Sequence, residues 1–207
     1  MEYCDKTLSQ YRVEKGGKLN LSEIKEIFFQ LNNALKYLSE NNIIHRNLKL
    51  ENVLIKTKDN NNIIKLGNFG LSKYTHENEL ISTNCGTPVY IAPEIQSGRY
   101  TTNSDIWSVG IMMYLLRFGE MPNFKETYKL NQNNIVFSEE DTVILNLLNK
   151  IIEEPTKRIS WNEYFSHEFF RTEEQNIENL NKKKIFKSIF DFKNEITSML
   201  ILNNNDL

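Results

Sequence analysis

The amino-acid sequence predicts a mainly helical α+β fold that contains one short β-hairpin. Apolar residues recur at three- and four-residue spacing between Ser22 and Ser39, which is the pattern of an amphipathic helix. The segment from Ser104 to Phe118 leaves almost no polar face, so it predicts a helix at the centre of a domain. Two short apolar runs, 51–56 and 63–66, flank a polar stretch and predict the hairpin.

The first helix follows a short N-terminal stretch of mixed composition, in which Gly16-Gly17 predicts a turn. Asn20 or Ser22 is expected to be the N-cap, and Asn41-Asn42 ends the helix. Its predicted apolar face consists of Ile24, Ile27, Phe28, Leu31, Leu35 and Leu38.

Beyond the hairpin, residues 71–91 lack periodicity and predict a long loop, which in a compact domain is usually functional. The central helix is expected to begin at Asn103 or Ser104. Later helices are expected at residues 124–130, 139–152 and 161–165.

Changes in composition divide the chain into three expected segments. These are a lead-in at 1–19, a main domain at 20–170 and a C-terminal tail at 171–207. The tail contains Lys182-Lys183-Lys184, followed by apolar residues at helical spacing. Such a stripe either docks on its own domain or binds a partner helix.

Charge and cysteine content exclude several classes of protein. The net charge of -2 gives no basic footprint for nucleic acid. The longest apolar run, from Ile106 to Phe118, is too short to span a bilayer. Cys4 and Cys85 are too few for a disulfide framework, and no secretory start precedes them. We therefore expect a cytoplasmic protein with reduced thiols, with a nuclear location left open.

One short loop combines hydrogen-bonding side chains with apolar anchors. It runs from Ile44 to Ile55, between the first helix and the hairpin. Its residues 45–52 resemble the catalytic loop of eukaryotic protein kinases, whose signature is H-R-D-L-x-x-x-N. The third position of that signature is Asn47 here instead of Asp.

Further stretches resemble kinase motifs in the family's order, so the resemblance covers residues 1 to about 170. They are the hinge (1–4), the D-F-G position (68–70), the end of the activation segment (86–94), the central helix of the large lobe (105–110) and that lobe's last helices (155–159 and 167–170). The resemblance implies the fold of a kinase large lobe, with the hairpin at the catalytic loop. The Gly-rich loop, the strand Lys and the helix Glu of the small lobe have no counterpart, so we expect that lobe to be absent and Leu54 and Phe69 to be exposed.

The resemblance implies sites for ATP and Mg²⁺. The catalytic positions are Asn47, Lys49 and Asn52. Asn52 and Asn68 are the metal positions, and Asn68 replaces the D-F-G Asp. The adenine positions are Glu2 and Cys4 at the hinge and Leu54 beneath the base.

Other positions are implied to be regulatory or structural. Arg46 would receive a phosphate from the activation segment, where Ser82 and Thr83 are the candidates. Thr87 in the same segment, together with Lys49, favours the serine/threonine branch of the family. The implied structural positions are His45, Phe69, Asp105 bonded to the loop backbone, and the ion pair of Glu94 with Arg158.

Asn47 and Asn68 leave three functional hypotheses. An amide is a poor base, and Mg²⁺ in phosphoryl-transfer sites usually takes one or two carboxylates. The first hypothesis is an impaired pseudokinase that acts by binding a protein. The second is a fragment of a working kinase that phosphorylates protein Ser/Thr once a small lobe is supplied. The third is a helical partner-binding module.

Overall fold

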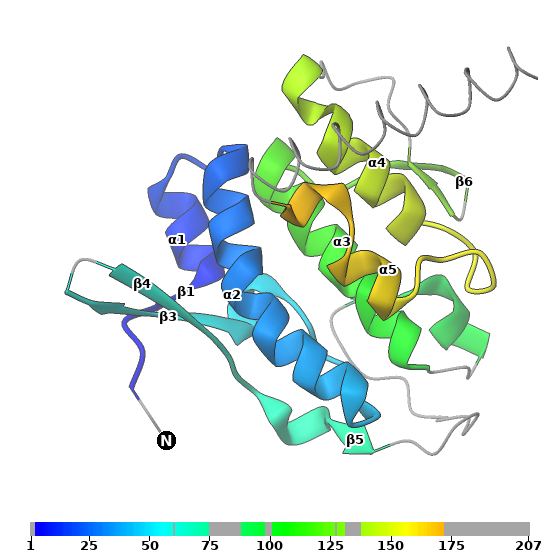
Figure 1. Ribbon diagram of the computed structural model, residues 1–207, viewed down its shortest axis with the longest axis horizontal. Coiled ribbons are helices and arrows are strands. Elements are labelled where there is room, and N and C mark those ends of the chain that lie inside the picture. Colours follow the sequence, from blue (N-terminus) through cyan, green and yellow to red (C-terminus); the bar gives the residue numbers. More distant parts are fainter. Residues whose placement is uncertain are drawn as a thin grey trace, which may run out of the picture. The chain divides into compact units, whose positions relative to one another are not determined.

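The computed structural model describes residues 3–59, 61–74, 88–97, 101–126, 128–130 and 138–171 (Figure 1). The α-helices are α1 (Leu8–Glu14), α2 (Leu21–Glu40), α3 (Thr102–Phe118), α4 (Thr142–Ile151) and α5 (Trp161–Phe165). The strands are β1 (Lys6–Thr7), β2 (Ile43–Ile44), β3 (Val53–Lys58), β4 (Asn61–Leu66), β5 (Lys73–Tyr74), β6 (Phe124–Glu126) and β7 (Lys129–Leu130). Short 3₁₀ turns are η1 (Leu50–Asn52), η2 (Phe69–Leu71), η3 (Pro88–Tyr90), η4 (Pro93–Ser97), η5 (Glu139–Asp141) and η6 (Glu168–Phe170).

Helix α2 forms as its sequence predicts. The Asn20 side chain accepts a hydrogen bond from the Glu23 N–H at 2.9 Å, and the Glu23 carboxylate accepts one from the Asn20 N–H at 3.2 Å. This reciprocal pair satisfies two backbone donors that would otherwise be orphaned at the helix start. The predicted apolar face is buried at all six positions.

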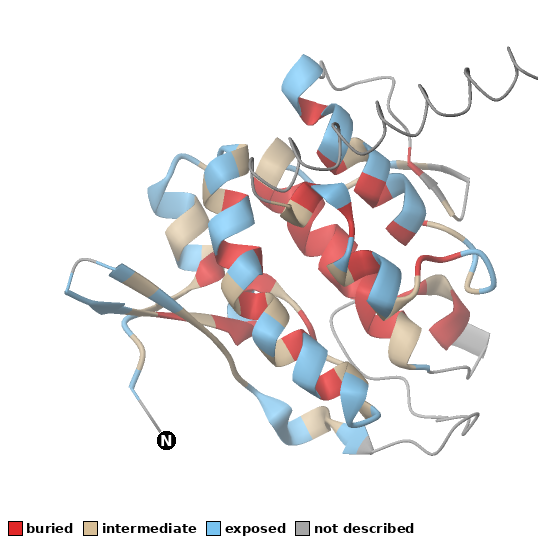
Figure 2. Cartoon of the chain, in the orientation of Figure 1, coloured by how far each residue is buried: buried red, intermediate tan, exposed pale blue. Residues whose placement is uncertain are grey.

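Helix α3 is the centre of the hydrophobic core. Every residue from Ser104 to Leu116 is buried, and α2 and α4 pack against it (Figure 2). Gly119 ends the helix in a left-handed conformation, with φ of 82°. The helix begins at Thr102, one or two positions before the predicted start at Asn103 or Ser104, because Thr101 is the N-cap and the Ser104 hydroxyl accepts a hydrogen bond from the Thr101 N–H.

The hairpin prediction is confirmed, although its sheet has one strand more. β3 pairs antiparallel with β4, and the lead-in adds β1 on the other edge of β3. The Gln30 side chain fixes this sheet to α2, since its amide donates to the Asn62 carbonyl and accepts from the Ile64 N–H, both at 3.0 Å. For residues 1–19 the sequence predicted only a turn at Gly16-Gly17, and the structure adds β1 and the short helix α1 there.

The helix predicted at residues 124–130 is wrong, since the structure has strands β6 and β7 there. Phe124 stacks on the ring of Trp107 at 5.6 Å, and Tyr128 meets the same ring edge-on at 6.1 Å. A segment of this length is too short to form a stable helix unaided, so packing on Trp107 decides its conformation. The helices predicted at 139–152 and 161–165 are present as η5 with α4 and as α5.

The tail predicted at 171–207 lies outside the described residues, apart from Arg171. Its helical character and the boundaries at 19 and 170 stay predictions. Within the part of the chain that the structure describes, no helix combines the length and apolar character that crossing a membrane requires.

Candidate functional site

The loop from His45 to Asn52 is hydrogen-bonded to the central helix α3. The buried Asp105 carboxylate of α3 accepts hydrogen bonds from the backbone N–H groups of His45, at 2.7 Å, and Arg46, at 3.1 Å. The predicted contact is therefore present. Burial raises the pKa of Asp105 to about 7, although these two N–H groups and the Arg46 charge act in the opposite direction.

The His45 ring is a packed structural group. It is fully buried, its Nε2 lies 3.0 Å from the Gly67 carbonyl oxygen, and Phe69 meets it edge-on at 4.9 Å. Since a carbonyl only accepts, Nε2 carries the proton and Nδ1 is left to accept from the Asn47 N–H at 3.4 Å. Burial lowers the pKa of His45, which keeps the ring neutral.

The three asparagines at the predicted catalytic and metal positions are linked by hydrogen bonds. The Asn52 side-chain NH₂ donates to the Asn47 main-chain carbonyl at 2.6 Å. The Asn68 NH₂ donates to the Asn52 Oδ1 at 3.1 Å. Asn68 is in a left-handed conformation, with φ of 62°, in the turn between β4 and η2. The structure thus brings the predicted catalytic and metal positions together.

The side chains at the two implied metal positions, Asn52 and Asn68, do not fit Mg²⁺ as ligands. Neither Asn52 nor Asn68 has a carboxylate, and the Asn52 Oδ1 already accepts the Asn68 NH₂. In the described part of the chain, no group of three or more His, Cys, Asp or Glu side chains is placed to hold a metal. In phosphoryl-transfer sites Mg²⁺ keeps several waters and is usually bound through one or two carboxylates together with phosphates, and the two amides supply no carboxylate.

The positions implied for phosphate regulation are only partly described. Arg46 has a positive φ of 64°, and its Nε donates to the Leu71 carbonyl, which ties the loop to η2. Ser82 and Thr83, the two candidates to pair with Arg46, lie outside the described residues, as does Thr87, so this pairing stays a prediction.

Asp5, which follows the hinge-like stretch 1–4, is hydrogen-bonded to strand β3. The Asp5 N–H donates to the Ile55 carbonyl at 2.9 Å, and the Asp5 carboxylate accepts from the Thr57 N–H at 2.7 Å. Cys4 and Leu54 are half-buried, and Glu2 is outside the described residues.

The two apolar side chains that were expected to be exposed, Leu54 and Phe69, differ in their exposure. Phe69 is 48% exposed, as expected. Leu54 is half-buried, because it pairs with Thr7 of β1 across the sheet and packs against Gly67. A Cβ atom on Gly67 would lie 2.9 Å from the Leu54 Cδ1, so glycine permits this close approach.

The predicted ion pair of Glu94 with Arg158 is present and buried. The two guanidinium Nη atoms donate to the two carboxylate oxygens at 2.5 and 3.0 Å. The guanidinium also lies over the Trp107 ring, 5.2 Å from its centre. This fork fixes η4 to the turn before α5.

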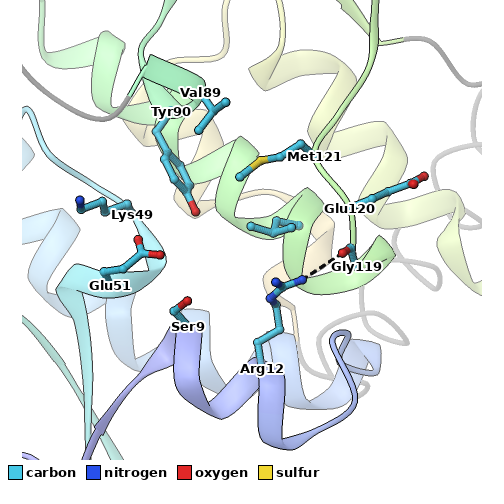
Figure 3. Close-up of a pocket in the computed structure, with 10 residues that line it drawn as sticks. Ser9, Arg12, Lys49, Glu51, Val89, Tyr90, Gly119, Glu120 and Met121 are labelled. Atoms are coloured by element: carbon cyan, nitrogen blue, oxygen red, sulfur yellow. Dashed lines mark hydrogen bonds between the residues drawn. The ribbon is translucent and has the colours of Figure 1, made fainter.

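A cleft of about 590 Å³ opens beside the loop (Figure 3). Figure 3 shows the Tyr90 hydroxyl and the Glu51 carboxylate directed toward the same open space, with Ser9 and Arg12 rising from α1. Burial raises the pKa of Tyr90 to about 12, and the Glu51 charge adds to this effect. The lining residues are Ser9, Arg12, Lys49, Glu51, Val89, Tyr90, Leu115, Gly119, Glu120 and Met121.

The sequence analysis identified Lys49 but missed the cleft around it. Its lining comes from four separate stretches of the chain, and one of them is α1, a helix that the sequence analysis did not predict. No pattern in the sequence indicated the cleft. Two apolar residues that line it, Val89 and Met121, are 50% and 40% exposed, but the exposed fraction of a side chain is known only from the fold.

Comparison with known proteins identifies relatives over most of the chain. Residues 1–170 match the family described as "Protein kinase domain". The serine/threonine-protein kinase atg1 of Dictyostelium discoideum is 34% identical over 81% of this chain and 25% of its own length. The serine/threonine protein kinase OSK3 of Oryza sativa subsp. indica is 35% identical, over 83% of this chain and 35% of its own. The chain thus spans about a quarter to a third of these relatives.

Proposed function

Because the chain belongs to the eukaryotic serine/threonine protein kinase family, we propose that it is a pseudokinase that acts by binding a protein. Residues 20–170 correspond in this proposal to the large lobe of the family. The observation that carries the proposal is the hydrogen-bonded chain of Asn47, Asn52 and Asn68, which occupies the catalytic and metal positions without a carboxylate.

The first chemical consequence concerns the general base that accepts the proton of the substrate. The family's catalytic Asp accepts the proton of the substrate hydroxyl. The Asn47 amide has no useful basicity, and His45, whose imidazole lies beside it in the described part of the chain, is buried with Nδ1 turned to the Asn47 N–H. General acid–base catalysis contributes about 10²–10⁴-fold, so its loss alone slows transfer by that order.

The second consequence concerns the phosphates. The family uses ATP with Mg²⁺ bound by the D-F-G Asp and the catalytic-loop Asn. Asn68 removes the charged ligand, so the β- and γ-phosphates lose a main electrostatic clamp. Lys49 lines the cleft beside these positions.

Partner binding is supported by the cleft next to the loop. Val89 and Met121 present partly exposed apolar surface, while Glu51 and Glu120 bring negative charge to the same space. Arg12 and Lys49 bring positive charge to it as well, so the cleft suits a protein segment that carries an apolar residue flanked by both an acidic and a basic side chain. A photo-crosslinking residue at Met121 should capture the partner, whereas one at Val13, 66% exposed on α1 and outside the cleft, should not.

The experiment that can refute the proposal directly is phosphate transfer from radiolabelled ATP to a protein substrate, with an active serine/threonine kinase as the positive control. We expect no transfer above background from the native chain. We expect none from N47D/N68D, because both replacements restore charge without supplying the lid of a kinase. Transfer by the native chain at a rate of about 1–100 s⁻¹ would refute the proposal.

The second candidate function is a working kinase whose small lobe lies outside this sequence. It is favoured by the anchoring of the loop on Asp105 and by the small share of each relative that the chain covers. Fusing a kinase small lobe to the native chain separates the candidates. Transfer by this fusion supports the second function, and transfer only after N47D/N68D is added supports the first.

A further inference from the structure

We propose that Asn68 and Asn52 form an amide lock, in which one hydrogen bond takes the structural place of a bound metal. The lock is the bond from the Asn68 NH₂ to the Asn52 Oδ1. It makes the conformation of the loop independent of divalent cations. The inference concerns the stability of the site, so it goes beyond the proposed function and can fail separately from it.

The groups around each side-chain amide determine which way its oxygen and its NH₂ point. The Asn47 main-chain carbonyl can only accept, so the Asn52 NH₂ must face it across 2.6 Å. The Asn52 Oδ1 therefore points the other way, toward Asn68, and it too can only accept. Asn68 must then present its NH₂, as the structure has it. The network has one consistent arrangement and does not rest on a free choice of amide orientation.

The surroundings of the lock hold it in register. Asn52 is 6% exposed, and its main-chain carbonyl accepts from the Gly67 N–H at 2.9 Å, directly before Asn68. The Asn68 Oδ1 lies 3.8 Å from the position of a Cβ atom on Gly70, so the oxygen faces η2 and the NH₂ faces Asn52. Main-chain and side-chain bonds thus join the same two segments, the catalytic-like loop and the turn after β4.

Asn68→Asp tests the lock by exchanging NH₂ for oxygen at constant shape. Both Asn and Asp tolerate the left-handed conformation of this position, so the backbone is not strained. The new carboxylate oxygen would face the Asn52 Oδ1, and two acceptors repel each other without a proton or a cation between them. A divalent cation bridging these oxygens would relieve the repulsion.

The experiment measures the melting temperature of the whole chain in chelator and in millimolar Mg²⁺ or Mn²⁺. We expect the native chain to melt at the same temperature in both. In chelator N68D should melt about 2–4 °C lower, the shift that losing one net hydrogen bond produces in a protein of this size. Added metal should reverse that loss in N68D.

A matched control variant is N42D. Asn42 is exposed and also left-handed, with φ of 52°, but it lies in the turn after α2. N42D makes the same change of charge away from the lock, so its melting temperature should not depend on metal. A metal response in N42D equal to that of N68D would overturn the proposal.

A second readout locates the metal and does not depend on the size of a melting shift. In ¹H–¹⁵N spectra, paramagnetic Mn²⁺ should broaden the backbone signals of residues 67–70 in N68D and leave them sharp in the native chain. Broadening of these signals in the native chain, or a native melting temperature that rises with metal as in N68D, would overturn the lock. Equal melting of N68D and the native chain in chelator would do so too.

Discussion

Two buried charged side chains, Asp105 and Arg158, each hold separate parts of this domain together. Asp105 is an ionisable group beneath a loop, held by two backbone N–H groups. Arg158 reaches Glu94 from a turn and stacks on an indole ring. Each group is buried, so the charge state or loss of one partner affects the whole fold.

Removing one partner of the Glu94–Arg158 pair should be severely destabilising. R158A leaves the buried Glu94 carboxylate without its two guanidinium donors, so we expect a loss of about 3–5 kcal/mol in the free energy of unfolding. Urea unfolding measures this. The matched control is K157A, which breaks the exposed bridge of Lys157 with Glu154 and should leave the free energy of unfolding nearly unchanged. Similar losses in the two variants would contradict this reading.

Asp105 should give the stability of the domain a specific pH dependence. Its pKa is raised by burial to about 7 in the folded state, above the ordinary value of 3.8. The folded chain therefore binds a proton that the unfolded chain has released, and stability from this group falls as pH rises through this interval. The slope approaches about 1.4 kcal/mol per pH unit.

The measurement compares the free energy of unfolding of the native chain and D105N between about pH 4 and pH 7. D105N should be less stable, since its amide oxygen can accept from only one of the His45 and Arg46 N–H groups and its NH₂ faces the other, but the component of the slope due to Asp105 should vanish. An identical slope in both proteins would show that Asp105 does not titrate in this range.

At the scale of the helices, Gly110 permits the close contact of α3 with α4. A Cβ atom on Gly110 would lie 2.4 Å from the Ile151 Cγ2, far inside contact distance. G110A should therefore lower the free energy of unfolding by about 1–3 kcal/mol, even though alanine favours helices. The same change in an I151A background should cost less, because the clashing methyl is gone. Equal costs in both backgrounds would exclude the clash as the cause.

For the folded chain as a whole, residues Met1–Phe170 form one compact unit. Its described core ends with Phe169, which packs against Phe170 at 5.1 Å between ring centres. A chain ending at Arg171 should therefore melt within about 2 °C of the full chain, a difference well under 1 kcal/mol. Differential scanning calorimetry checks this, and a larger drop would show that residues 172–207 stabilise the unit.

Local sequence pattern was enough where a segment's own periodicity determines its structure. The apolar stripe and Asn20 predict α2, and the uniformly apolar segment predicts the buried α3. Pattern failed at Phe124, because the Trp107 ring that directs this residue into a strand is distant in sequence. The two-residue strand β1 was missed for the same reason, since its partner β3 lies about fifty residues later.

The site was predictable in its members but not in its bonding. Motif order identified Asn47, Asn52 and Asn68 together. The contact of Asn68 with Asn52 depends on the left-handed backbone at Asn68, which no periodicity reports. The cleft needed η3 and the end of α3 to meet α1, a tertiary arrangement without a local signal.

The hydrogen bonds from His45 and Arg46 to Asp105 join positions 60 and 59 residues apart. Loop amides usually exchange their hydrogens with water through small local openings. These two cannot, since freeing them requires the loop to leave the central helix and expose a buried carboxylate. Their hydrogens should therefore exchange as slowly as those in the middle of α3. A segment without regular secondary structure would thus report on the global unfolding of the protein.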